Sequence, residues 1–296
     1  MNGAQTPIVQ AAHRRALRAH LSGAWLAPSL LGLLLTFAYW PTIIETAGHL
    51  KGNEDMGQAY MAPLVAGYVI WEKRHTLRRG MPSLWGIAWL SLGGLLAFPA
   101  IIGASATLSR VGFFCSLAGC VLVVGGGILL RQLAFPLSLL LFMVPVPGLL
   151  YDEITLPLRL LATRLGEGAL ELLGFSVVRY GNVLELPYGR LHVIDACSGI
   201  RSLLALGFAT LSYGYLFEPR LWLRGALVLS SVPIAILLNA VRVTVTAVLL
   251  RSHPQWTVGP VHDTLGWIMF FAAFAALVVV HLIGVRLTYG KSSSAG

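Results

Sequence analysis

The stretch DACSGIRSLLALGFATLSYGYLF, residues 195–217, decides the fold, because a short polar opening leads directly into a long apolar run. Cys197 and Arg201 lie one helical turn apart in that opening. A cation at i+4 on the same helix face lowers the pKa of a thiol and favours the reactive thiolate. The stretch therefore predicts a poised cysteine at the head of a membrane helix.

Composition extends this prediction to the whole chain. Of 296 residues, 56% are hydrophobic and only 11% are charged, and the mean hydropathy is +0.76. These values exclude a soluble globule and predict a polytopic membrane protein. The net charge of +9 comes from basic residues clustered beside apolar segments, which is the positive-inside pattern and not a nucleic-acid-binding surface.

The two other cysteines, Cys115 and Cys120, lie in one apolar segment far from Cys197. This spacing predicts no disulfide framework. Both are interpreted as small core residues.

Apolar segments along the chain predict an all-α polytopic fold with about eight transmembrane helices, each compared with the ~20 residues that cross a ~30 Å hydrocarbon core. The predicted spans cover residues 21–44, 58–71, 83–103, 111–130, 133–150, 197–217, 225–250 and 262–285. A short loop holding Arg110 joins the third span to the fourth.

The segment 151–196 has a different character and is predicted to leave the bilayer. Leucines at near-helical spacing over 154–173 predict a helix lying in the membrane interface. Residues 177–180 and 183–186, joined near Gly181-Asn182, predict a β-hairpin, and 191–194 predicts a third strand. Either this segment is a cap that holds an extended peptide near the thiol, or it is a connecting loop.

Basic residues predict the orientation, since they favour the cytoplasmic side. With the amino terminus inside, the cytoplasmic segments collect 12 of the 21 basic residues: Arg14, Arg15, Arg18, Lys73, Arg74, Arg78, Arg79, Arg131, Arg220, Arg224, Arg286 and Lys291. Both termini are therefore expected in the cytoplasm. The predicted organisation is a cytoplasmic segment 1–20, five transmembrane helices in 21–150, an extracytoplasmic interfacial helix and β-hairpin in 151–196, catalytic helices six to eight in 197–285, and a cytoplasmic tail 286–296.

This orientation brings three polar residues to one side of the membrane. Cys197 opens an inward-going helix, and His262 opens the final helix on the same side. Arg242 lies nine residues before Arg251, roughly 13 Å below the outer end of its helix. An intramembrane arginine costs about 2.5 to 3.5 kcal/mol on insertion scales, so it predicts a partner and a function. Cysteine, histidine and arginine are the parts of a thiol acyl-transfer site.

Four further residues are candidates for supporting these three or for contacting substrate: Arg201, Asn239, Asp195 and Ser198. Asn239, three residues before Arg242, either orders the guanidinium or packs in the helix interface. Asp195 is interpreted chiefly as a helix cap. Arg201 either acts in the site or extends towards the interface.

The chain resembles the exosortase and archaeosortase family. The resemblance rests on three ordered motifs, Ala196–Ser202, Pro233–Val243, and His262 followed by Gly266-Trp267. Weaker similarity lies in residues 60–74, 135–136, 142–147 and 174–182, so that together the matches cover roughly 60–271. Archaeal relatives carry a second arginine where His262 stands, so the resemblance is to the bacterial members.

The resemblance implies an integral-membrane cysteine protease and transpeptidase of the bacterial cytoplasmic (inner) membrane. Its substrates would be exported proteins with a carboxy-terminal sorting tail similar to the PEP-CTERM signal. Cys197 would be the nucleophile, Arg242 the motif arginine and His262 the general base or acid. The resemblance implies no cofactor and no metal, and the acceptor of the acyl group is either water or an amine on a glycan or lipid.

One alternative from another class is a multi-pass transporter or channel component of an export system, for which an intramembrane arginine and proline-broken helices are also typical. A second is a scaffold for polysaccharide export, which leaves Cys197 unexplained. An acidic substrate motif would suit four arginines of the predicted cap, Arg159, Arg164, Arg179 and Arg190.

Overall fold

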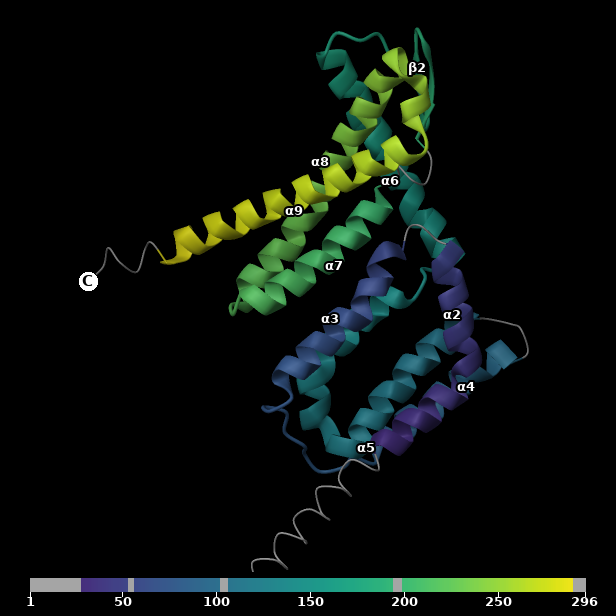
Figure 1. The fold of residues 1–296 in the computed structure, drawn as a ribbon, viewed down its shortest axis with the longest axis vertical. Helices are drawn as coiled ribbons and strands as arrows, with labels where there is room; N and C mark the ends of the chain where they lie inside the picture. The colour runs from purple at the N-terminus through teal and green to yellow at the C-terminus, as the bar shows by residue number, and fades with distance from the viewer. Residues whose placement is uncertain (1–27, 53–55, 102–105, 194–198, 290–296) are drawn as a thin grey trace, which may run out of the picture. The chain divides into compact units, whose positions relative to one another are not determined.

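A computed structural model describes residues 28–52, 56–101, 106–193 and 199–289 of the protein (Figure 1). The described chain is mostly helical, with one three-stranded sheet. Its contacts divide it into two compact units. The first comprises Met1–Gly52 and Ala66–Val144, and the second comprises Asn53–Val65 and Pro145–Gly296. Helix α3, Gly57–Lys73, contributes to both.

The first unit is a packed set of apolar helices. Pro28–Ala38 and Trp40–Lys51 form a pair bent by 66°, the second member belonging to helix α2, Trp40–Gly52. Helix α4 covers Trp85–Ile101, and helix α5 covers Ala106–Leu140 with non-helical geometry at Gly126. The 3-10 turn η2, Leu141–Met143, follows α5 directly.

Glycines bring α4 and α5 into backbone contact. A Cβ atom at Gly86 would lie 2.8 Å from the carbonyl oxygen of Gly119, and one at Gly93 would lie 2.6 Å from that of Gly112. Gly86 and Gly93 are seven residues apart on α4, and Gly112 and Gly119 are seven residues apart on α5. Each helix therefore presents its two glycines on one face. Small residues permit this close approach, which supplies packing energy where lipid removes the hydrophobic driving force.

Helix α2 and Tyr39, the residue directly before it, pack on α5 through polar side chains. Tyr39 and Thr42 form hydrogen bonds to Ser116 at 2.9 Å and Ser109 at 2.6 Å. The predicted loop position of Arg110 is wrong, because Arg110 lies in the first turns of α5 and is buried. Its guanidinium donates to Thr46 at 3.0 Å and lies 3.6 Å from the Glu45 carboxylate. This pairing compensates the burial of the charge.

The predicted number of eight spans is not confirmed. Among the described residues, four helical segments are long and apolar enough to cross a membrane, or five if the bent pair counts as one span. The four are Ala106–Met143, Ile200–Phe217, Leu221–Ser252 and Pro260–Thr288. Helices α3 and α4 have 17 residues each, which is about 26 Å and falls short of a ~30 Å core. The predicted boundary between the fourth and fifth spans at Arg131 is wrong, because the chain is helical through Arg131 and the kink that separates the two helical stretches of α5 lies at Gly126. The protein is thus a multi-pass membrane protein with fewer clear spans than its hydropathy predicts.

The second unit contains a helix and the small sheet. Helix α6 covers Gly148–Leu172 and includes all of the predicted helix 154–173 except its last residue. The strands are β1, Val178–Tyr180, β2, Val183–Leu186, and β3, Gly189–His192, in antiparallel order β1-β2-β3. The hairpin turns at Gly181-Asn182 as predicted, and Gly181 has a φ of 62°, which a two-residue hairpin turn requires.

The third strand begins two residues earlier than predicted, and Ile194 lies outside the described residues. The two-residue turn Pro187-Tyr188 pairs Leu186 with Gly189, so β3 begins directly after the turn. Leu184 and Leu186 point inwards from β2 and pack with Leu170 of α6. The sheet therefore has one buried face.

Three long helices complete the second unit. They are α7, Ile200–Phe217, α8, Leu221–Ser252, and α9, Pro260–Tyr289, with the 3-10 turn η4, Pro254–Thr257, between the last two. Figure 1 shows α7, α8 and α9 as neighbours, and each contacts the other two. Leu206, Ala235 and Ala273 form a core where the three meet.

The sheet and α6 pack on α8. Val243 and Ala247 of α8 share a buried cluster with Ala162, Leu184 and Val193. A Cβ atom at Gly166 of α6 would lie 2.9 Å from the Val243 side chain, so the two helices approach closely. This cluster holds the sheet against Val243, the residue that follows Arg242 in sequence.

Candidate active site

Helix α8 carries two buried polar residues, Asn239 and Arg242, each 3% exposed. They are three residues apart and share a helix face, as their spacing predicts. The rest of the helix between Gly225 and Leu250 carries only small hydroxyl side chains besides apolar ones, so the two side chains are the strongest polar groups along this stretch. Their polar groups therefore depend on neighbouring elements for hydrogen bonds.

Helix α9 supplies one of these neighbours at its first turn. Nη2 of Arg242 donates to the backbone carbonyl of His262 at 3.3 Å, across 20 residues of sequence. His262 is itself 8% exposed. Its imidazole lies within electrostatic range of the guanidinium groups of Arg242 and Arg201 and of the Asp263 carboxylate. The structure therefore brings Arg242, His262 and Arg201 together.

A glycine on α9 forms the seat of the Arg242 side chain. A Cβ atom at Gly266 would lie 3.2 Å from both Cζ and Nη2 of Arg242. The guanidinium plane therefore rests on the backbone of α9 one turn after His262. Sequence reasoning gave Gly266 no role of its own, although its i+4 spacing from His262 was a usable signal.

The start of α7 reaches the same face of α8. Gly199 is the N-cap of α7 with a φ of 85°, and a Cβ atom there would lie 3.1 Å from Nδ2 of Asn239. A side chain at position 199 would meet both the left-handed backbone penalty and this close approach. Asn239 of α8 thus packs closely against Gly199 at the start of α7.

Three predicted site residues, Asp195, Cys197 and Ser198, lie outside the described residues. Arg201, in the first turn of α7, is half-buried. Of the predicted site, the structure thus describes Arg201, Asn239, Arg242 and His262, and places them where α7, α8 and α9 meet.

A small cavity of about 10 Å³ lies between the same three helices and shares Asn239 and Arg242 with the candidate site. Its polar lining comes from Ser202, Asn239 and Arg242, and Leu206, Ala235 and Phe270 are among its apolar residues. This is roughly the space of one water molecule. The sequence indicates Ser202 only as the last residue of a motif, because its position in the cavity lining depends on how α7 is rotated against α8.

No group of three or more His, Cys, Asp or Glu side chains with metal-binding geometry occurs within the described ranges. Cys115 and Cys120, both on α5 in the first unit, are free thiols. They belong to a different unit from Arg242 and His262.

Two of the four arginines expected to receive an acidic motif are engaged elsewhere. Arg179 donates to Glu167 at 2.6 Å, and Arg190 lies 2.7 Å from Glu185. Arg164 is exposed on α6. Because these two arginines are paired with glutamates, the surface offers an acidic partner less net positive charge than four unpaired arginines would.

Comparison with known proteins places the chain in a family. Residues 46–279 match the family described as Transmembrane exosortase (Exosortase_EpsH), and they include every element of the described site. The chain therefore belongs to the transmembrane exosortase family. No curated protein and no solved structure matches the chain. Family membership gives the protein a general role in processing the sorting signals of exported proteins.

Proposed function

We propose that the protein is a cysteine peptidase and transpeptidase that cleaves PEP-CTERM-like carboxy-terminal sorting tails through a thioester on Cys197. The observation that carries this proposal is a chain of contacts across three helices. Gly199, two residues after Cys197, touches Asn239, and Arg242 on the same face of α8 contacts α9 at His262 and Gly266. Three segments far apart in sequence thereby meet in one region: the start of α7, which follows Cys197 in sequence, the guanidinium of α8 and the first turn of α9, which carries the imidazole.

In the first half-reaction, His262 takes the proton from the Cys197 thiol. The thiolate then attacks the scissile carbonyl carbon, and the carbonyl π electrons move to oxygen to give a tetrahedral oxyanion. When this intermediate collapses, the C–N bond breaks, and His262 returns the proton to the departing amine. The products are a Cys197 thioester and the released tail.

In the second half-reaction, an acceptor attacks the thioester carbonyl. The acceptor is either water or an amine on a glycan or lipid, and His262 takes its proton. Collapse breaks the C–S bond, and the proton passes to sulfur to regenerate the thiol. Hydrolysis and transpeptidation thus share one site and differ only in the nucleophile.

Arg242 is assigned to electrostatic stabilisation. A guanidinium carries five N–H donors, of which one contacts the His262 carbonyl. Donors directed at the developing oxyanion from a site with little water typically contribute 10²- to 10³-fold in rate. The same guanidinium could instead hold the thiolate or a carboxylate of the tail, and the buried seat on Gly266 suits each of these roles.

The proposed setting is the bacterial inner membrane, with both termini in the cytoplasm and the site on the extracytoplasmic side. The distribution of Lys and Arg supports this orientation. An outward-facing site would meet exported proteins while their apolar tails still lie in the bilayer.

The test is co-expression of the protein with a tailed substrate, followed by mass measurement of the substrate. Cys197→Ala is expected to abolish cleavage, and a Cys115→Ala/Cys120→Ala variant is expected to retain it. A peptide-like electrophile should modify Cys197 in preference to the two α5 cysteines. Full cleavage by Cys197→Ala would end this mechanism.

A further inference from the structure

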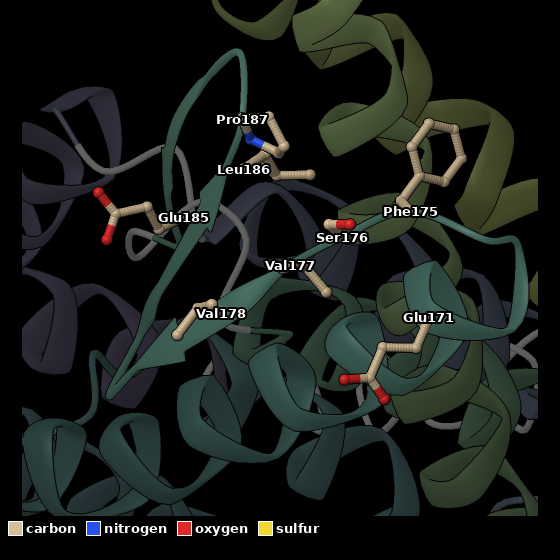
Figure 2. A pocket seen from close by; sticks show the side chains of 8 residues that line it. All are labelled: Glu171, Phe175, Ser176, Val177, Val178, Glu185, Leu186 and Pro187. Carbon is tan, nitrogen blue, oxygen red and sulfur yellow. The ribbon is translucent and has the colours of Figure 1, made fainter.

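The second unit contains an open groove of about 490 Å³ between the end of α6 and the hairpin. Figure 2 shows Glu171 on α6 on one side, the segment Phe175–Val178 across the middle, and Glu185–Pro187 on the other side. The volume falls in the usual range of ligand sites, ~300–1,000 Å³. All of its lining residues belong to the second unit.

The groove is apolar along its floor and is joined to the core beside the candidate site. Leu186 belongs to the buried cluster that contains Val243, and Phe175 and Val177 pack against that cluster. Val243 directly follows Arg242 on α8. A segment seated in the groove would therefore lie against the packed layer that holds the candidate site.

Charge distinguishes this groove from the rest of the sheet surface. Its lining contains two carboxylates, Glu171 and Glu185, and no basic residue. Glu185 is paired with Arg190 at 2.7 Å. Glu171 is exposed, and its carboxylate has no partner among the residues that the structure describes. One uncompensated negative charge thus stands at the edge of an apolar trough.

One wall of the groove is main chain entering an edge strand. β1 pairs only with β2 within the described sheet, and Phe175–Val178 leads into it. An open trough beside an edge strand suits an extended peptide, whose alternate side chains reach the floor. A small ion would leave the apolar floor uncovered.

We propose that this groove binds an extended segment of the protein substrate that carries a lysine or arginine between apolar side chains, with the cation at Glu171. This inference rests on the proposed function, since it assigns the groove to the substrate of that same site. The apolar neighbours of the cation cover Val177 and Leu186, and the carboxylate selects against an acidic residue at this position.

The experiment measures peptide binding separately from cleavage. Full-length protein in phosphatidylcholine nanodiscs is titrated into fluorescein-labelled peptides of sequence Val-Leu-Xaa-Val-Leu, with Lys or Glu as Xaa, and fluorescence anisotropy is recorded. The Lys peptide is expected to bind more tightly than the Glu peptide. Glu171→Gln should weaken the Lys peptide about threefold to fivefold, the upper range for an exposed ion pair.

Two further variants sharpen the result. Glu171→Lys should invert the preference, so that the Glu peptide binds more tightly than the Lys peptide. Glu153→Gln removes an exposed carboxylate of the same helix outside the groove and should leave both affinities unchanged. Size-exclusion profiles check that each variant remains folded.

The outcomes separate the two proposals. Equal affinities for both peptides, no binding of either, or equal effects of Glu153→Gln and Glu171→Gln would overturn the groove assignment while leaving tail cleavage intact. Glu171-dependent binding without cleavage of any tailed protein would instead overturn the proposed function.

Discussion

At the scale of single residues, the candidate site depends on what surrounds Arg242. An arginine inside a bilayer is expensive unless its donors are met, and the structure gives it a carbonyl of α9. The sequence identified Arg242, Asn239 and His262 by their polarity in apolar surroundings. The spacing of Gly266 from His262 indicates a shared helix face, but it does not show that the missing side chain matters, because that depends on a neighbouring helix approaching within contact distance.

Gly266→Ala is expected to lower the cleavage rate. The new Cβ atom would lie 3.2 Å from the guanidinium carbon, so the Arg242 side chain must shift by a few tenths of an ångström. A displacement of about 1 Å can cost up to about 10²-fold in rate, so this smaller shift should cost less. We expect a kcat lower by about threefold to tenfold with a much smaller change in KM, measured by tail cleavage in nanodiscs.

The matched control for this substitution is Gly207→Ala on α7, where an added Cβ meets nothing within 4 Å. Gly207→Ala should retain wild-type cleavage, since it adds a methyl group to a membrane helix without a clash. Wild-type kcat in Gly266→Ala would show that the position of the guanidinium does not limit the reaction.

At the scale of elements, a buried polar cluster ties the far ends of α7, α8 and α9 together. His281 of α9 lies between Tyr213, at 2.8 Å, and the Glu218 carboxylate, at 3.0 Å. The backbone N–H of Arg220 donates to the same carboxylate at 2.8 Å. Position 281 is 19 residues after His262, about 28 Å along the helix. The cluster therefore fixes the register of the helix that carries His262.

Glu218 should make the folded protein sensitive to acid. Burial by itself raises the pKa of its carboxyl, but hydrogen bonds from His281 and Arg220 and nearby positive charge outweigh burial and hold the pKa below its usual value. A depressed pKa in the folded state contributes stability above the unfolded pKa, about 4.3 for glutamate, and this contribution is lost as pH falls through the folded value.

Glu218→Gln is accordingly expected to be less stable than wild type at neutral pH and to lose less stability on acidification below about pH 4.3. Thermal unfolding in detergent, repeated from pH 7 to pH 3, measures the slope of stability against pH for wild type and for Glu218→Gln. Glu153→Gln, which removes an exposed carboxylate, should keep the wild-type slope. Parallel pH profiles for wild type and Glu218→Gln would contradict the assigned role of the cluster.

At the scale of the whole molecule, hydropathy indicates a polytopic membrane protein. Among the described residues, the structure contains fewer helices long enough to cross a membrane than hydropathy predicts. Segments 111–130 and 133–150 read as two helices because Arg131 interrupts the apolar run. In the structure the helix continues through Arg131 and changes direction at Gly126. Hydropathy records where charges lie, whereas helix ends depend on local backbone geometry.

The predicted orientation can be tested with single cysteines in a background lacking Cys115, Cys120 and Cys197. Gln255→Cys is exposed in the turn between α8 and α9, and His75→Cys is exposed after α3. A membrane-impermeant maleimide applied to intact spheroplasts should label Gln255→Cys and should label His75→Cys only after permeabilisation. The reverse pattern would place the α8–α9 turn, and with it the candidate site, on the cytoplasmic side.

The sequence by itself determined that this is a membrane protein of apolar helices with a hairpin turning at Gly181-Asn182, because hydropathy and turn chemistry act over a few neighbouring residues. Only the tertiary structure decided that Gly199 meets Asn239, that Arg242 rests on Gly266, and that Glu171 faces an apolar groove. These contacts depend on the rotation and register of helices packed against each other. Both are set by interlocking side chains from distant parts of the chain.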